Sequence, residues 1–541
     1  MKYLFSILLI SALHFSNAQC NPSTEKMMVI GDSWAFFSWT GNSYNENLDR
    51  FGFSDITCYS TVNLAVNGAE ASDYFTDPSR VQELEDYILG NPDLEYVHMS
   101  LGGNDALGTW HKDFTNQQTS DLLDTIMIDI KNGIDTVLSF NPNLTIVIAG
   151  YDYANFSETV GTLPALAQPF HPYYDTWDGM GQPNPEELNG ILQLATDRFE
   201  DSAAVWNNVK FENNLGLMQW VYGQIDPLEV APYGTYPPNT APLPGGYNDY
   251  PSPLDALNFG GQDSFHLNDD AYEEFIKKYF SQYYWQQFRD YHHSISANES
   301  NYNGTLTASS SNSASILIGN ENFEERQGVF SFNTSTFDDT YTIEHAALYM
   351  QRDSADGDDL AGLDVDLEIK SGFFGGSINL ENDDFASVGD ESATLCTYGT
   401  IDQNGHWMRI DLPPSMFQYI DANGTTQFKL SYDIADSSRY IAFGNEIDQA
   451  MLDVRYTENP SVAIADNEVD FFVYPNPTNG LLKIKTEEQI NSVQLFDLKG
   501  QLVLSKLNPS SEIDLTNTPA GIYILQVDLN GNIKQQKVVR R

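Results

Sequence analysis

The chain is poor in basic residues, in cysteines and in long apolar runs. Its 541 residues include only 26 Lys and Arg against 76 Asp and Glu, so its formal charge is −50. This balance argues against binding nucleic acid or an anionic membrane surface, because both are bound through Lys and Arg. Three cysteines are too few for a disulfide scaffold. Charged residues make up 19% and hydrophobic ones 41% of the chain, which is a globular composition and not that of a disordered acidic protein.

The apolar run nearest the N-terminus, Tyr3 to Leu13, is too short to cross a bilayer. Small residues at Ser16 and Ala18 follow it, a pattern that predicts a signal peptide over residues 1–18. We therefore expect an exported protein with no transmembrane segment. Cys20 raises a lipoprotein as the alternative, although Gln19 stands where a lipidation signal needs a small residue.

The three cysteines leave two interpretations open. In an oxidising compartment Cys20 and Cys58 can pair and leave Cys396 odd. The alternative is three buried or unpaired thiols.

Residues 19–294 alternate buried strands with helices. Continuous apolar runs predict strands, and apolar residues at helical spacing predict the helices between them. The alternation is typical of an α/β domain with a parallel sheet between two helical layers. A long stretch rich in Pro, Gly and aromatic residues, Tyr151 to Gly261, is partly a loop, and loops of that length are usually functional. The strands are expected at Met27–Ile30, Tyr96–Leu101 and Leu144–Ala149, and the helices at Pro78–Leu89, Asp121–Phe140 and Pro185–Trp206.

Ser33 directly follows the first predicted strand, in the sequence Gly31-Asp32-Ser33-Trp34. Parallel sheets bind ligands at the carboxyl ends of their strands, so Ser33 is a candidate nucleophile. The alternative is an ordinary turn before a helix. Gly68 follows the second strand, where a glycine lets a backbone N–H approach a reacting group.

Two further elements lie on the same rim, one directly after the third predicted strand and one just before the predicted helix Asp269–Phe288. Asn104, in Leu101-Gly102-Gly103-Asn104-Asp105, can offer a side-chain N–H to an oxyanion. His266 is a candidate general base for the serine, since its ordinary pKa is near neutrality. Asp263, three residues earlier, can hold the imidazole in the required tautomer.

Taken together, these four elements resemble the motif blocks of the SGNH hydrolases, also called GDSL esterases and lipases. The resemblance implies a flavodoxin-like α/β/α three-layer fold. It implies Ser33 as nucleophile, His266 as base and Asp263 as its partner. The oxyanion donors would be the N–H groups of Ser33 and Gly68 and the side chain of Asn104. Trp34 departs from the family, which more often has an aliphatic residue there, and this puts the pocket shape in doubt.

Residues 297–459 have a different pattern of apolar and polar residues. Short alternating runs bounded by Gly, Asn and Asp predict a β-sandwich module, and a Ser- and Asn-rich stretch at Ala308–Ser315 resembles a linker. Such modules, often appended to secreted hydrolases, bind carbohydrate or serve as spacers. One loop gathers Asp353, Asp356, Asp358 and Asp359, which could hold calcium, although a solvated acidic loop is the simpler interpretation.

Residues 468–541 form a small all-β unit after a linker at 460–467. It opens with Phe472-Val473-Tyr474-Pro475-Asn476-Pro477 and closes with Lys537-Val538-Val539-Arg540-Arg541. It resembles the sorting domain of the type IX secretion system of Bacteroidetes. The resemblance implies that this machinery is a partner, that the protein crosses the outer membrane to the surface or outside, and that the unit is removed.

The sequence therefore predicts a secreted serine esterase that needs no cofactor. The favoured substrate is an acetylated polysaccharide, because of the appended sandwich. A lipid ester is the alternative favoured by the aromatic insertion. A non-catalytic glycan-binding surface adhesin is the rival from another class.

Overall fold

The computed structural model describes residues 20, 23–224, 235–289, 293–296, 302–313, 315–337, 341–353, 364–399, 403–432, 439–446, 448–458, 471–486, 488–497, 501–507, 509–530 and 532–541. The chain divides into two compact units, Met1–Thr457 and Glu458–Arg541. The expected signal peptide and the expected linker at 460–467 lie outside the described residues, so both stay predictions.

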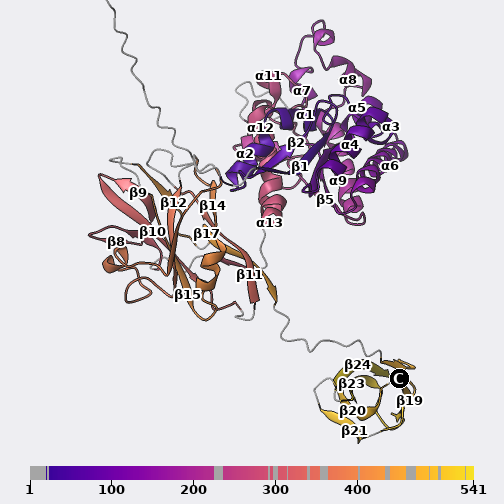
Figure 1. Ribbon diagram of the computed structural model, residues 1–541. Coiled ribbons are helices and arrows are strands. Elements are labelled where there is room, and N and C mark those ends of the chain that lie inside the picture. Colours follow the sequence, from indigo (N-terminus) through magenta and orange to yellow (C-terminus); the bar gives the residue numbers. More distant parts are fainter. Residues whose placement is uncertain are drawn as a thin grey trace, which may run out of the picture. The chain divides into compact units, whose positions relative to one another are not determined.

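A five-stranded parallel sheet lies at the centre of the first half of the chain (Figure 1). Its order is β2-β1-β3-β4-β5, the order of flavodoxin-like folds, and it confirms the expected fold class. Because the order reverses beside β1, the loops that follow β1 and β3 face one crevice at the carboxyl edge. The strands are β1 (Thr24–Gly31), β2 (Ile56–Tyr59), β3 (Tyr96–Ser100), β4 (Thr145–Ala149) and β5 (Val209–Glu212).

Both faces of this sheet are buried under helices. Successive side chains of a strand point to opposite faces, and in β1 Met28 and Ile30 join one apolar core while Met27 and Val29 join the other. The first core is completed by α4 (Pro78–Gly90), α6 (Asn116–Phe140) and α9 (Pro185–Ala203). The second is completed by α1 (Ser33–Thr40), α2 (Ser43–Arg50) and α12 (Asp269–Tyr279).

The segment Tyr151–Gly261 contains the helix expected at Pro185–Trp206, and shorter helices precede it. Between β4 and β5 the chain forms α7 (Phe156–Thr159), α8 (Tyr174–Gly179) and then α9. Asn184 and Glu187 close a capping box at the start of α9, which explains why the helix begins there. Residues 225–234 of this segment lie outside the described residues.

The middle of the chain folds as two antiparallel sheets around one apolar core. β8 (Ser311–Asn312) pairs with β7 (Gly304–Leu306), so Ala308–Ser315 contains the second strand of a hairpin. The expectation that this stretch is a linker is therefore wrong. β6 (His293–Ser296) precedes the expected start of the module at residue 297 and pairs with β17 (Ala450–Glu458). One sheet holds β13 (Glu391–Leu395), β12 (Val365–Ser371), β15 (Thr425–Ser431), β10 (Glu324–Asn333), β7 (Gly304–Leu306), β8 (Ser311–Asn312), β9 (Ile316–Glu321) and β16 (Arg439–Phe443); the other holds β14 (Trp407–Asp411), β11 (Tyr341–Gln351), β17 (Ala450–Glu458) and β6 (His293–Ser296).

The sandwich and the α/β part share buried side chains within the first unit. Tyr349 and Trp407 of the sandwich belong to the same apolar core as Phe53 and Phe288. Arg409, also in the sandwich, places its guanidinium 2.7 Å from the Asp55 carboxylate and is 6% exposed. An interface of this kind is built like a domain core and not like a flexible tether.

A disulfide joins Cys20 to Cys396 across 376 residues of sequence, while Cys58 is a buried free thiol. The expected pairing of Cys20 with Cys58 is therefore wrong, and so is the expectation of three unpaired thiols. Cys58 lies in β2 inside the second core, and burial raises the pKa of its thiol well above the ordinary value. Since the Cys20 sulfur is bonded to Cys396, the disulfide also argues against the lipoprotein alternative.

The second unit is all-β, as expected. One sheet holds β18 (Phe472–Tyr474), β19 (Leu481–Lys485) and β22 (Glu512–Asp514), and the other holds β21 (Leu502–Leu507), β20 (Ile490–Asp497), β23 (Gly521–Leu529) and β24 (Asn532–Arg540). Their alternating side chains enclose a small apolar core of their own.

Candidate active site

Ser33 is the first residue of α1 and follows β1 after a single intervening residue. Gly31 has a φ of +144°, and a Cβ built there would lie 2.1 Å from the carbonyl oxygen of Ser100 on β3. Only glycine therefore fits this turn. Asp32 caps the helix by accepting a hydrogen bond from Trp34 N. The first N–H groups of a helix have no partner within the helix, so α1 itself does not use the Ser33 N–H.

The structure brings the three candidate triad residues into one hydrogen-bonded chain. Ser33 Oγ lies 2.8 Å from His266 Nε2, and His266 Nδ1 lies 3.0 Å from Asp263 Oδ2. The loop that carries the histidine is held by its backbone, because Asn258 N donates to the His266 carbonyl and α12 begins three residues later. A serine hydroxyl, an imidazole and a carboxylate in this order can activate the serine oxygen.

Asp263 is fully buried yet remains ionised. Burial raises its pKa, but the hydrogen bond and charge of His266 and the backbone N–H groups of Phe265 and His266 outweigh burial and hold it below the ordinary value. A charged carboxylate is the form that can hold Nδ1–H of the imidazole and stabilise an imidazolium.

Tyr173 adds a contact that the sequence did not indicate. Its hydroxyl donates to Asp263 Oδ2 at 2.8 Å and lies 3.0 Å from His266 Nδ1. Tyr173 directly precedes α8, about 90 residues before Asp263. It belongs to an aromatic-rich stretch that the sequence marks as unusual, but nothing in the local pattern distinguishes it from the other tyrosines there.

The candidate oxyanion donors come from the loops after β2 and β3. Gly68 has a φ of +80°, a conformation that favours glycine. Asn104 lies in the first turn of α5 (Gly103–Thr109), and its Nδ2 donates to the Ala69 carbonyl at 2.9 Å. A side-chain amide carries two N–H groups. One of them fixes Asn104 to the Gly68 loop, and the second can serve a reacting oxygen.

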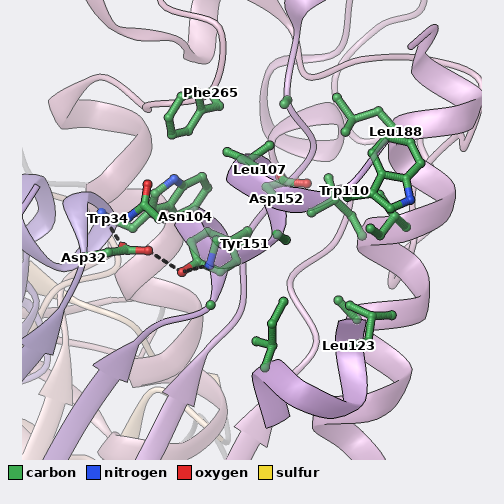
Figure 2. A pocket seen from close by; sticks show the side chains of 18 of the residues that line it. Asp32, Trp34, Asn104, Leu107, Trp110, Leu123, Tyr151, Asp152, Leu188 and Phe265 are labelled. Atoms are coloured by element: carbon green, nitrogen blue, oxygen red, sulfur yellow. Dashed lines mark hydrogen bonds between the residues drawn. The ribbon is translucent and has the colours of Figure 1, made fainter. Parts of the chain in front are cut away.

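Asp32 and Tyr151 form a second buried pair beside Ser33 (Figure 2). The Tyr151 hydroxyl donates to Asp32 Oδ2 and accepts a hydrogen bond from Gly103 N, so it links the loops after β1 and β3. Burial raises the pKa of Asp32 to about 7, even though the hydrogen bonds from the Tyr151 hydroxyl and from Trp34 N lower it. The Trp34 ring packs edge-on against Tyr151, Tyr272 and Phe275, which accounts for the large side chain at this position.

An apolar cavity opens beside Ser33, which is one of its lining residues. Asp32, Trp34 and Asn104 lie at one end of the view in Figure 2, and Trp110, Leu123 and Leu188 lie at the other. The cavity runs between α5, α6 and α9. The cavity is therefore adjacent to the hydrogen-bonded residues Ser33, His266 and Asp263.

The described residues contain no group of three or more His, Cys, Asp or Glu side chains placed to hold a metal ion. Of the expected calcium loop only Asp353 is described, so that expectation stays a prediction. In the same described part of the chain, no helix has both the length and the apolar character needed to span a membrane.

Two family models match the chain. Residues 27–279 match the GDSL-like lipase/acylhydrolase family, and residues 472–541 match the secretion-system C-terminal sorting domain. A search of curated protein sequences finds no match to the chain.

Solved structures similar to the chain include two esterases and a lipase, all at low identity. A carbohydrate esterase family 3 protein from Talaromyces cellulolyticus is 11% identical with a TM-score of 0.27, over 49% of this chain and 99% of its own. Est24, a carbohydrate acetylesterase from Sinorhizobium meliloti, is 12% identical with a TM-score of 0.25, over 48% of this chain and 99% of its own. An extracellular lipase from Streptomyces rimosus is 12% identical with a TM-score of 0.24, over 48% and 99%.

The order of the sheet, the position of Ser33 after β1 and the match of the family models agree with one another. Residues 27–279 belong to the GDSL-like lipase/acylhydrolase family, and residues 472–541 are a sorting domain that directs the protein by type IX secretion to the cell surface or outside.

Proposed function

We propose that the α/β domain hydrolyses carboxylic esters through an acyl-enzyme on Ser33. The observation that carries the proposal is the 2.8 Å hydrogen bond from Ser33 Oγ to His266 Nε2, with Asp263 on the other imidazole nitrogen. This arrangement favours an enzyme over the glycan-binding adhesin, because a protein that only binds glycans does not need an activated serine. Glycan binding by the sandwich stays a prediction.

In the first half-reaction His266 Nε2 takes the proton of Ser33 as Oγ attacks the ester carbonyl. Negative charge develops on the carbonyl oxygen, and the N–H groups of Ser33 and Gly68 and the amide of Asn104 are its proposed donors. The imidazolium then gives its proton to the departing alcohol. The products of this half-reaction are the free alcohol and an ester of Ser33.

In the second half-reaction a water molecule gives a proton to His266 and attacks the acyl carbon. Collapse of the second tetrahedral intermediate breaks the bond to Ser33 Oγ, which recovers the proton, and the carboxylic acid leaves. Asp263 keeps its charge throughout and holds Nδ1–H, since its pKa lies below the ordinary value.

The test compares hydrolysis of p-nitrophenyl butyrate by the wild-type chain and Ser33→Ala. We expect kcat to fall about a thousandfold or more, because loss of the nucleophile leaves only the oxyanion donors and binding. Ser281→Ala is the matched control, since Ser281 is exposed and its hydroxyl donates to the carbonyl of Lys278 three residues earlier. A Ser33→Ala chain that keeps more than about a tenth of the activity would exclude Ser33 as nucleophile.

A fluorophosphonate gives a second readout that does not depend on the choice of ester. We expect one adduct on the wild-type chain, located on Ser33 by peptide mass spectrometry. The adduct should be absent from Ser33→Ala. In His266→Ala it should form much more slowly, because the Ser33 hydroxyl needs the imidazole as its base.

A further inference from the structure

The cavity beside Ser33 extends well beyond the space of an acetyl group. Its lining reaches from Ser33 to Leu188 and Phe199 on α9. We propose that this cavity binds the acyl part of the substrate, and that the acyl part is an unbranched apolar chain of medium or greater length. The inference rests on the proposed function for the chemistry, and it names the substrate class of the same site.

The walls away from Ser33 are apolar along their length. On α6 the cavity is lined by Leu123, Ile126 and Met127, and on α9 by Leu188, Ile191 and Phe199. At 1.5 Å per residue, the stretch of α9 from Leu188 to Phe199 forms a wall of about 16 Å. A wall of that length suits an acyl chain of roughly eight carbons or more, and most of it would stay empty above an acetyl group.

Away from Ser33 and Asn104, the polar groups of Asp152, Trp110 and Tyr151 at the cavity are already hydrogen-bonded within the protein. The Asp152 carboxylate accepts N–H groups from Tyr153, Gly216 and Met218 at 2.7–2.8 Å. Trp110 Nε1 donates to Thr119 Oγ1, and the Tyr151 hydroxyl donates to Asp32. A sugar ring placed here would lose its hydrogen bonds to water without replacement, whereas an alkyl chain gains from burial.

The position of the cavity decides which side of the ester it receives. Its lining includes Ser33 and Gly102, Gly103 and Asn104, the loop of the proposed oxyanion donor. A carbonyl carbon at Ser33 therefore has its acyl chain directed between α6 and α9. The alcohol part of the ester then lies outside this apolar cavity, so the cavity sets no limit on its size or polarity.

Chain-length preference is the first test. With p-nitrophenyl acetate, butyrate, hexanoate and octanoate, kcat/KM of the wild-type chain should rise about three- to fourfold for each methylene that enters the cavity. A maximum at acetate, with lower values for each longer chain, would overturn the inference and favour an acetyl esterase.

Blocking the cavity is the second test. Ala195 lies on α9 one turn from both Ile191 and Phe199 and lines the cavity, so Ala195→Phe places a ring inside it. We expect octanoate turnover to fall at least about tenfold while acetate turnover stays within about twofold. Leu194→Phe is the matched control, because it adds the same ring at the neighbouring position, where the side chain is 47% exposed. Equal loss on both esters by Ala195→Phe would contradict a cavity that holds the acyl chain.

Binding to Ser33→Ala separates this inference from the proposed chemistry. Titration calorimetry should find octanamide bound at least about a hundredfold more tightly than acetamide, since six more methylenes are buried. If the wild-type chain hydrolyses no ester but Ser33→Ala shows this difference, the proposed chemistry fails and the binding inference stands. If the two amides bind alike, the binding inference fails whatever the esterase activity.

Discussion

The Tyr173 hydroxyl donates a 2.8 Å hydrogen bond to Oδ2 of Asp263, the same carboxylate oxygen that faces His266 Nδ1. The carboxylate is thus held from two sides, by an imidazole of its own loop and by a phenol from a segment about 90 residues away. This makes Tyr173 a positioning residue for the proposed triad, since it acts on the substrate only through Asp263 and His266.

Tyr173→Phe should lower kcat about tenfold with a KM change below about twofold, because a hydrogen bond to a charged group contributes roughly 1.5–3 kcal/mol. Steady-state kinetics on one soluble ester measures both constants. Tyr174→Phe, at the next position, is the control and should leave both unchanged. An effect of Tyr173→Phe on KM alone would mean that the hydroxyl serves substrate binding and not the triad.

Asp32 should make stability depend on pH. Burial raises its pKa in the folded chain to about 7 from an ordinary value of 3.8, so the folded form binds the proton more tightly than the unfolded form. The contribution of Asp32 to stability therefore falls as pH rises from about 4 to about 7, and the full penalty is present above pH 7.

Asp32→Asn removes this titration and keeps a residue that caps helices well. We expect the Tm of the variant relative to wild type to be higher at pH 8 than at pH 5, measured by differential scanning calorimetry. Asp201→Asn, at an exposed position of α9, should show no such change with pH. A difference that is constant between the two pH values would mean that Asp32 does not titrate in this range.

The shared core predicts that the sandwich and the α/β part unfold together. Trp407 is 5% exposed and its ring lies 4.5 Å from that of Trp285. Trp407→Ala should destabilise the first unit by about 3–5 kcal/mol, as expected for loss of a buried Trp. The midpoint of heat inactivation of the esterase should fall with the calorimetric Tm. Val388→Ala, at a 75% exposed position of the sandwich, should leave both in place. If Trp407→Ala left the midpoint of heat inactivation of the esterase unchanged, the α/β part would fold independently of the sandwich.

The Cys20–Cys396 disulfide should stabilise the first unit, because it closes a loop of 376 residues in the unfolded chain. A Cys20→Ser/Cys396→Ser chain should lose about 2–5 kcal/mol of unfolding free energy. Dithiothreitol should lower the Tm of the wild-type chain and leave that of the double variant unchanged. An equal effect of the reductant on both would exclude this disulfide as its target.

Protein recovered from the native culture medium should lack the C-terminal unit. Its mass should be lower than that of the full chain by the signal peptide and the sorting domain, with an end near residues 459–466, since sorting segments are processed away from the working protein. Intact-mass measurement checks this. A secreted form that still ends at Arg541 would exclude cleavage while leaving the sorting role of the unit intact.

The sequence by itself determined the features that depend on short stretches of chain. A buried strand followed at once by Gly31, Asp32 and Ser33 can only place the serine at the carboxyl edge of a parallel sheet, and the spacing of Asp263 and His266 lets the two side chains meet within one loop. The strands of both all-β parts could be read in the same way, because alternation with a period of two is a local signal.

The tertiary structure alone decided the features that join distant segments. Three cysteines allow three pairs, and nothing local favours Cys20 with Cys396 over the alternatives. Tyr173 reaches Asp263 only because the segment before α8 folds back onto the loop that carries Asp263 and His266. The apolar residues of α6 and α9 have the helical spacing of an ordinary core, and whether such faces close on each other or leave a cavity is set by three-dimensional packing, which hydrophobic periodicity does not encode.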